Sequence, residues 1–252
     1  PPSVPFEQGA VMMCSSATSL HALRKGRLKA GETVLVVGAG GLGMSAVQLA
    51  RALGASDVIA VDRDPMKLAL AERFGARTIR ATDLSPDDVV AQVRAMTNGR
   101  GVDVALELVG NPDTMRTALQ SLAPLGRAVV VGLSDINLPV DTYRDLIGRE
   151  AELIGSNDHL LSELYELVEM ADKGILNLAD VVMHTVPLQA RDINGVLDAL
   201  DEAMAARGKH DGSLPSSSSA SESTAKRTRY FSCSAGAGST AGSFVRADKV
   251  RA

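Results

Sequence analysis

The chain has 252 residues, of which 45% are hydrophobic and 22% are charged, and its formal net charge is -4. This composition is typical of a globular protein of one or two domains, and it gives no reason to expect a nucleic-acid or anionic-membrane partner. No apolar run reaches the ~18 residues that cross a bilayer, and the N-terminal segment lacks the pattern of a signal peptide, so we expect a cytoplasmic protein. The two cysteines, Cys14 and Cys233, exclude a disulfide framework.

Short apolar runs alternate with segments of helical periodicity from residue 33 onward. The runs are short enough to be strands buried on both faces, and they occupy 33–37, 58–61, 102–106, 128–132 and 152–154. Helical periodicity occurs over 44–53, 66–74, 85–96, 113–122 and 160–173. This alternation predicts an α/β fold with a Rossmann-type doubly wound parallel sheet, whose strand C-termini form one ligand-binding edge.

The C-terminal part of the chain changes character. A strand-like run at 181–186 and a helical pattern at 189–205 continue the alternation, but from residue 211 the sequence is rich in serine, alanine and glycine. Such a segment buries too little surface to offset its chain entropy, so we expect a disordered tail over 208–252. A flexible linker is the alternative, and the abrupt change also fits a frame change.

The chain begins with proline rather than methionine, which indicates that residue 1 is not the natural start.

A glycine pattern, VLVVGAGGLG at 34–43, follows the first predicted strand and opens the first helix. G-x-G-x-x-G in this position is typical of loops that bind the pyrophosphate of a dinucleotide. The first glycine allows the tight turn, the second lets the backbone approach the phosphates, and the third permits close packing of helix on strand. Backbone N–H groups at the start of the helix would meet the phosphates. The expected contacts come from Gly38, Gly40, Gly41, Leu42 and Gly43.

An acidic residue ends the second predicted strand at the spacing that such loops require. The strand closes in VDRD, which places Asp62 nineteen residues beyond Gly43. A carboxylate there accepts both hydroxyl hydrogens of an adenosine ribose and repels a 2′-phosphate, so NAD is favoured over NADP. Arg63 beside it would soften that preference. The alternative is a tight strand–helix turn without a ligand and a surface aspartate.

Several joined motifs together resemble one family. They are EQGAVMMCSSATSLHAL at 7–23, KAGETVLVVGAGGLG at 29–43 and VDRDPMKL at 61–68. In this order they are similar to the coenzyme-binding half of the zinc-dependent, medium-chain alcohol and polyol dehydrogenases. The resemblance covers about residues 1–205. It implies that residues 1–30 are a remnant of the catalytic domain with its linking helix, and that residues 31–207 are an NAD-binding Rossmann domain.

The resemblance also implies roles for individual residues. Cys14 matches the position of a catalytic zinc ligand, although a lone cysteine is also a small buried hydrophobe. Thr18 would lie near the nicotinamide and Lys67 near the adenosine ribose, although Lys67 also suits a solvated first turn. Residues at the ends of later strands would line the coenzyme, or else form plain core: Leu108, Val109, Val131, Gly132 and Leu133.

The activity that the resemblance implies is hydride transfer between a small-molecule alcohol or polyol and the nicotinamide, with zinc polarising the substrate oxygen. The other two zinc ligands of the family belong to a catalytic domain that is not found before Pro1, so we expect this chain alone not to hold zinc. A non-catalytic NAD-binding module is the alternative. The resemblance further implies a homodimer that pairs near Glu152. A structural role is favoured for His21 and His184, which lie among apolar neighbours.

Overall fold

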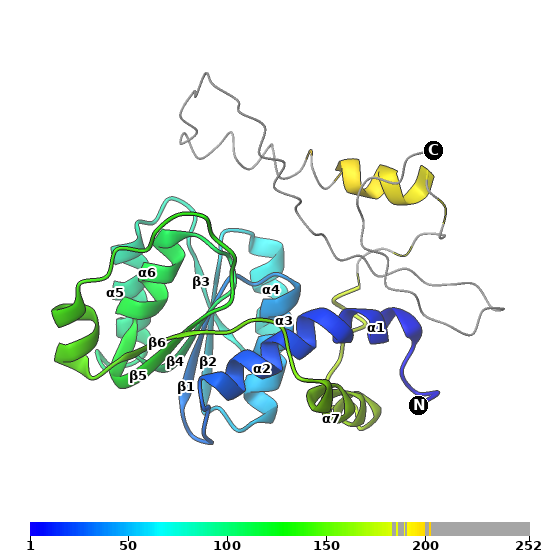
Figure 1. Ribbon diagram of the computed structural model, residues 1–252, viewed down its shortest axis with the longest axis horizontal. Helices are drawn as coiled ribbons and strands as arrows, with labels where there is room; N and C mark the ends of the chain where they lie inside the picture. The colour runs from blue at the N-terminus through cyan, green and yellow to red at the C-terminus, as the bar shows by residue number, and fades with distance from the viewer. Residues whose placement is uncertain (183–184, 186–188, 190, 200–201, 203–252) are drawn as a thin grey trace. The chain divides into compact units, whose positions relative to one another are not determined.

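The structure is a computed structural model of the chain, and it describes residues 1–182, 185, 189, 191–199 and 202. The chain divides into two compact units, Pro1–Val181 and Val182–Ala252, and the first contains the sheet (Figure 1). In the second unit, residues 191–199 are helical, within the helix predicted over 189–205. The predicted tail and most of the predicted strand at 181–186, His184 included, lie outside the described residues.

One parallel sheet of six strands has the order β3-β2-β1-β4-β5-β6 (Figure 1). The direction of winding reverses between β1 and β4, which is the topological switch point of a doubly wound sheet. The predicted Rossmann-type fold is therefore confirmed. The strands are β1 (Thr33–Val37), β2 (Asp57–Asp62), β3 (Arg77–Arg80), β4 (Val102–Glu107), β5 (Leu122–Val130) and β6 (Glu152–Gly155).

Side chains of the central strand β1 alternate between two hydrophobic cores, one on each face of the sheet. Val34 and Val36 belong to the core that includes α2 and α3, whereas Leu35 and Val37 belong to the core that includes α5 and α6. No helix in the described part of the chain has the length and apolar character of a membrane span. The helices of the first unit are α1 (Phe6–Val11), the π-helical η1 (Met12–Ser16), α2 (Ala17–Lys25), α3 (Gly41–Ala52), α4 (Pro65–Arg73), α5 (Pro86–Met96), α6 (Pro112–Gln120), the π-helical η2 (Thr142–Leu146), the 3-10 helix η3 (Ile147–Arg149) and α7 (Leu161–Asp172).

Local sequence explains where several helices begin. The helices α4, α5 and α6 each start with a proline, because the first turn does not use that residue's N–H. The side chains of Asp64, Ser85 and Asn111 accept hydrogen bonds from the first-turn N–H groups of these helices. By contrast, no side chain caps the first turn of α3, where Gly40 occupies the cap position.

Three elements differ from the sequence-based expectation. The strand β3 was not predicted, because only Ile79 of its four residues is buried. The helix predicted over 113–122 ends at Gln120, and the strand predicted over 128–132 already begins at Leu122 and ends at Val130. Leu122 pairs with Val102 of β4 ahead of a register irregularity, so strand pairing overrides the helical periodicity there.

Candidate coenzyme site

The turn between β1 and α3 has a backbone geometry that needs its glycines. Gly38 adopts φ +98°, in the left-handed region that favours glycine, and its N–H donates to the Val61 carbonyl at 2.8 Å. A Cβ on Gly43 would lie 2.1 Å from the Gly38 carbonyl oxygen, so a side chain does not fit where α3 begins. A Cβ on Gly40 would meet nothing within 4 Å. Open space therefore adjoins the uncapped N-terminus of α3, an arrangement that suits an anionic group.

Asp62 lies at the end of β2, and its carboxylate is bound to the glycine turn. Its Oδ2 accepts the Ala39 N–H at 2.8 Å, and its Oδ1 accepts the Asp64 N–H at 2.9 Å. The side chain remains 14% exposed, and Lys67 Nζ lies 3.8 Å from Oδ2. The acid and the glycines are thus side by side, and a carboxylate oxygen can accept a second hydrogen bond besides the one described here.

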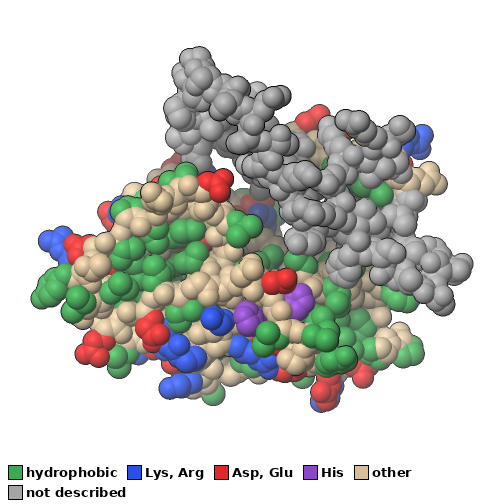
Figure 2. Space-filling model, viewed as in Figure 1, with side chains coloured by type: hydrophobic (Ala, Val, Ile, Leu, Met, Phe, Trp, Pro, Cys, Tyr) green, Lys and Arg blue, Asp and Glu red, His purple; other side chains and the backbone are tan. Residues whose placement is uncertain are grey.

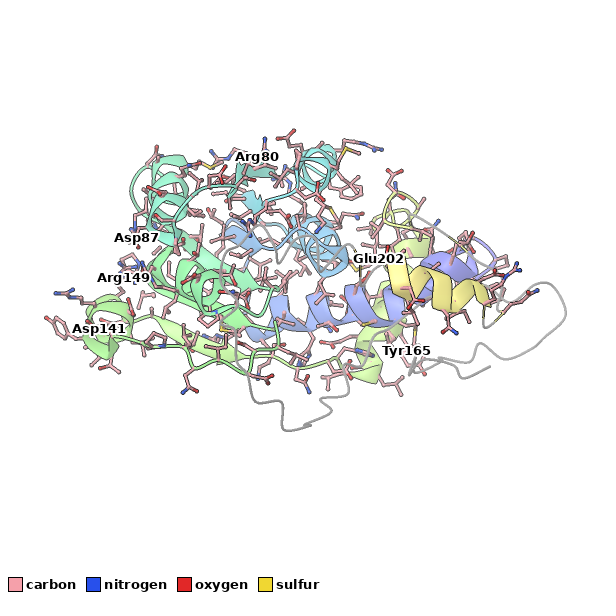
Figure 3. All side chains as sticks on the ribbon, turned by 90° about the horizontal axis from the view of Figure 1, so that it is seen from above. Arg80, Asp87, Asp141, Arg149, Tyr165 and Glu202 are labelled. Atoms are coloured by element: carbon pink, nitrogen blue, oxygen red, sulfur yellow. The ribbon has the colours of Figure 1, made fainter. Side chains whose placement is uncertain are left out.

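A further cation that sequence reasoning missed lies next to Asp62. Arg80 ends β3, in register with Asp62 of the neighbouring strand, and Figure 3 labels it on the sheet. Its Nε donates to Thr82 Oγ1 at 3.2 Å, and that hydroxyl donates to the Arg63 carbonyl at 3.0 Å. No signal in the sequence indicated Arg80, because β3 itself was not recognised.

The ends of β4 and β5 extend the same edge of the sheet. A Cβ on Gly38 would lie 2.7 Å from Val109 Cγ2, so the turn after β4 packs directly on the glycine turn. Val109 is 52% exposed and Leu133, beyond the end of β5, is 89% exposed. Two exposed apolar side chains therefore continue the edge beyond the glycine turn, in the region expected for the nicotinamide. Leu108 and Val131 are only partly buried and pack against the core that includes α2 and α3.

The helical segment from α1 to α2 places the remaining predicted residues. Figure 1 shows it as a continuous rod, and Ser19 in α2 donates its hydroxyl to the Leu42 carbonyl at 2.8 Å, which fixes α2 against the start of α3. Thr18, beside Ser19, is 8% exposed. Cys14 is partly buried in η1; burial, and then the nearby Asp158 carboxylate, raise the pKa of its thiol.

The residues around Cys14 do not make a zinc site by themselves. A catalytic zinc takes three protein ligands. Within the described ranges, no three His, Cys, Asp or Glu side chains are grouped so that they could hold a metal ion. The donor set offered by this part of the chain therefore does not fit zinc.

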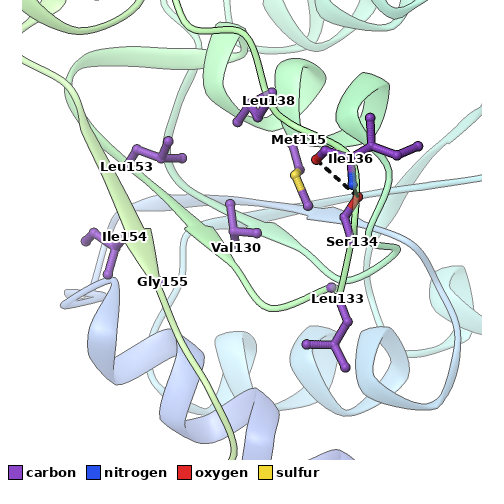
Figure 4. Close-up of a pocket in the computed structure, with 10 residues that line it drawn as sticks. Met115, Val130, Leu133, Ser134, Ile136, Leu138, Leu153, Ile154 and Gly155 are labelled. Carbon is purple, nitrogen blue, oxygen red and sulfur yellow. Dashed lines mark hydrogen bonds between the residues drawn. The ribbon is translucent and has the colours of Figure 1, made fainter. Parts of the chain in front are cut away.

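An open apolar depression of about 540 Å³ lies beside the edge strand β6 (Figure 4). Within it the Ile136 N–H donates to Ser134 Oγ at 3.2 Å. Hydrophobic side chains gather on this face in the space-filling view (Figure 2). Both Leu133 and Ile136 are more than half exposed. The depression is lined by Met115, Val130, Gly132, Leu133, Ser134, Ile136, Leu138, Leu153, Ile154 and Gly155.

Comparison with known proteins gives one family match and many relatives. The family model described as zinc-binding dehydrogenase matches residues 41–173. The sorbitol dehydrogenase of Bacillus subtilis is 30% identical over 207 residues, which are 81% of this chain and 55% of that protein. An NAD-dependent alcohol dehydrogenase of Sulfolobus acidocaldarius is 34% identical over 192 residues, which are 76% of this chain and 53% of that protein.

A solved structure has a similar fold. The alcohol dehydrogenase from Thermus sp. ATN1 superposes with a TM-score of 0.71 and 29% identity, over 80% of this chain and 58% of that one. The chain thus spans about half the length of the curated relatives it matches.

Proposed function

The chain belongs to the zinc-binding dehydrogenase family, and we propose that it forms the NAD-binding part of an alcohol or polyol dehydrogenase. In this proposal residues 31–207 are the coenzyme domain, and the preceding helical segment links it to the rest of the enzyme. The glycine turn would bind the pyrophosphate, with backbone contacts from Gly38 to Gly43. Asp62 would bind the adenosine ribose, and Thr18 would lie near the nicotinamide.

The observation that carries the proposal is the contact between Asp62 and the glycine turn. The Ala39 N–H holds the carboxylate at the point where α3 presents an uncapped N-terminus and open space beside Gly40. A dinucleotide needs both features together, because its ribose and its pyrophosphate are only a few bonds apart. A turn that serves only to connect a strand to a helix needs neither the acid nor the open space.

We propose NAD rather than NADP as the coenzyme. The carboxylate of Asp62 would repel a 2′-phosphate on the ribose it binds. Lys67 Nζ lies 3.8 Å from the carboxylate, Arg80 is in register with Asp62 on the next strand, and Arg63 follows it in the chain. Their positive charge weakens the repulsion without removing the carboxylate. NADPH should therefore bind measurably, and less tightly than NADH.

For the complete enzyme we propose hydride transfer between an alcohol carbon and the nicotinamide. Hydride transfer is supported by the relatives, which include a sorbitol dehydrogenase and a butanediol dehydrogenase. Cys14 would contribute one thiolate to a zinc site completed outside the described residues. A non-catalytic NAD-binding module is the second candidate, favoured by the incomplete ligand set around Cys14 among the described residues.

A homodimer through β6 is a further part of the proposal. This strand is the edge of the sheet among the described residues, where its outer N–H and C=O groups have no neighbouring strand. The apolar depression adjoins it, with Leu153 38% exposed on the strand itself. Two copies related by a two-fold axis would pair these edges and cover both apolar surfaces, because such an interface is self-complementary.

Calorimetric titration of the 252-residue chain with NADH tests the coenzyme assignment. We expect saturable binding of one NADH per chain, with weaker binding of NADPH. Incubation with NAD and either sorbitol or butanediol then tests for turnover, which requires a complete zinc site and would exclude the module. NADH binding without turnover fits both a coenzyme-binding part and a module, turnover excludes the module, and absence of NADH binding excludes both.

A further inference from the structure

Glu107 is a fully buried carboxylate at the end of β4, and sequence reasoning did not single it out. Its Oε1 accepts three hydrogen bonds, from the Val109 N–H at 2.9 Å, the Gly110 N–H at 2.9 Å and Thr114 Oγ1 at 2.7 Å. Its Oε2 is buried as well and accepts no hydrogen bond from any residue that the structure describes. A charged side chain in this setting calls for an explanation, because burying it is costly.

The main chain of the same residue binds the neighbouring strand end. The Glu107 carbonyl accepts the Val131 N–H at 2.9 Å and the Gly132 N–H at 3.1 Å. The side chain therefore holds the turn at 108–110, and the carbonyl holds the segment at 131–133. One residue joins the two segments that follow β4 and β5.

The two segments cross so closely that only glycines fit. A Cβ on Gly132 would lie 2.1 Å from the Gly110 nitrogen and 2.8 Å from Glu107 Oε2. A Cβ on Gly110, which has φ +85°, would lie 2.2 Å from the Leu133 carbonyl oxygen. Glu107 Oε2, which accepts no hydrogen bond from the described residues, therefore lies next to the point where the two segments cross.

The crossing continues the proposed coenzyme surface. Val109 packs on Gly38 of the glycine turn on one side of it, and the exposed Leu133 lies on the other. We propose that Glu107 is the positioning residue for the nicotinamide end of the coenzyme. It touches no coenzyme atom, and instead fixes the two segments whose apolar side chains would support the nicotinamide ring. The inference rests on the proposed coenzyme function.

The chemistry of the carboxylate explains why this position uses an acid. An ionised oxygen accepts several hydrogen bonds at once and holds two backbone N–H groups more strongly than a neutral acceptor does. In Glu107→Gln one oxygen remains for the three donors, but a buried NH₂ group replaces Oε2 where no acceptor is described. The turn at 108–110 should then shift relative to Gly132.

Two ligands separate a positioning role from a general structural one. NADH carries the nicotinamide, whereas ADP-ribose has the same adenosine and pyrophosphate without the ring. In Glu107→Gln we expect NADH affinity to fall about tenfold, the factor that corresponds to one buried donor left without an acceptor. ADP-ribose affinity should change less than about twofold, because the glycine turn and Asp62 are untouched. The fluorescence increase of bound NADH should shrink in parallel.

Matched variants complete the experiment. Thr114→Val removes one donor to Oε1 and should reproduce the selective loss in milder form, even if Glu107→Gln fails to fold. Glu32→Gln removes a carboxylate that pairs with Arg127 at 2.7 Å, at the opposite ends of the strands, and should leave the NADH to ADP-ribose ratio unchanged. An equal loss for both ligands in Thr114→Val, or unchanged NADH affinity in folded Glu107→Gln, would overturn the inference. If the wild-type chain binds neither ligand, the coenzyme proposal itself fails.

Discussion

The Asp62 carboxylate accepts the main-chain N–H of Ala39 at 2.8 Å, which ties the acid at the end of β2 to the glycine turn at the end of β1. The carboxylate therefore has two roles in the proposed site, as an anchor of the turn and as the negative charge beside the ribose. Substitutions that keep an oxygen acceptor and remove the charge separate these roles.

Asp62→Asn should weaken NADH binding about tenfold, since a neutral amide accepts ribose hydroxyls less strongly than a carboxylate. The preference for NADH over NADPH should shrink or reverse, because the remaining charges at Lys67 and Arg80 attract the 2′-phosphate. Titration with both coenzymes measures the ratio. Asp57→Asn, which changes an aspartate at the opposite end of β2, is the matched control. An unchanged ratio in Asp62→Asn would contradict the ribose assignment.

The two glycines at the start of α3 should respond differently to alanine. Gly43→Ala places a methyl group 2.1 Å from the Gly38 carbonyl oxygen, so we expect destabilisation of about 3 kcal/mol or more. Gly40→Ala places its methyl group in open space, so urea unfolding should shift by less than about 0.5 kcal/mol. The same methyl group would occupy the proposed pyrophosphate position, and NADH affinity should fall at least about tenfold. Normal NADH binding by Gly40→Ala would show that no phosphate approaches this turn.

The Glu163 carboxylate predicts a specific dependence of stability on pH. It is almost fully buried and accepts hydrogen bonds from the Leu160 N–H at 2.7 Å and from His21 Nδ1 at 3.1 Å. Burial acts to raise its pKa, but the hydrogen bonds from Leu160, His21 and Arg24 outweigh burial and hold the pKa below its ordinary value. Glu163 therefore stabilises the fold above pH ~4.3, and this contribution is lost as the pH falls through the lowered pKa of the folded state.

Urea unfolding of wild type and Glu163→Gln from pH 7 to pH 3 measures this contribution. The variant should be less stable by about 1–3 kcal/mol at pH 7, because the Leu160 N–H, His21 and Arg24 lose an ionised partner. The difference should be constant down to pH ~4.3 and then decrease. A difference that stays the same at pH 3 would mean that Glu163 is not the titrating group.

The Cys14 thiol should react slowly. Burial and the Asp158 carboxylate both raise its pKa, so at pH 8 less of it is thiolate than in an ordinary cysteine. Alkylation by iodoacetamide, measured in a Cys233→Ser background, should keep accelerating above the ordinary thiol pKa of ~8.5. Asp158→Asn should accelerate it at pH 8, since the repelling charge is gone. If both chains react alike at every pH, Asp158 does not act on Cys14.

The proposed dimer predicts the effect of a charge on β6. The wild-type chain should sediment with twice the monomer mass, and Leu153→Lys should sediment as a monomer, because a lysine ammonium would be desolvated in the paired edge. Ile175→Lys changes another exposed apolar residue, 46% exposed and away from β6, and should leave the dimer intact. Sedimentation of the wild type as a monomer would remove the support for this interface.

Much of the fold follows from the sequence because five of the six strands carry short apolar runs, and the sheet buries most of the run in β1, β2, β4 and β5. The glycine turn and Asp62 were predictable as well, since their spacing reflects a fixed geometry of strand, turn and helix. Edge strand β3 was not predicted, because an edge strand needs few apolar residues, and Arg80 was therefore not predicted as a site residue either. Glu107 was not predicted for a different reason. An acid at the end of an apolar strand has no periodic pattern, and its meaning depends on two backbone segments that only the fold brings together.

The position of β1 in the sheet has a consequence for how the chain folds. Its neighbour on one side, β2, follows after a single helix, but its neighbour on the other side is β4, and the hydrogen bond from the Thr33 N–H to Asp103 spans 70 residues. During synthesis β1, β2 and β3 can form a three-stranded half of the sheet before β4 is available to pair with the other edge of β1. Closing that edge requires ordering a long loop, which makes it the slower step. The glycine turn after β1 and the turn at 108–110 after β4 come together only when β1 and β4 have paired.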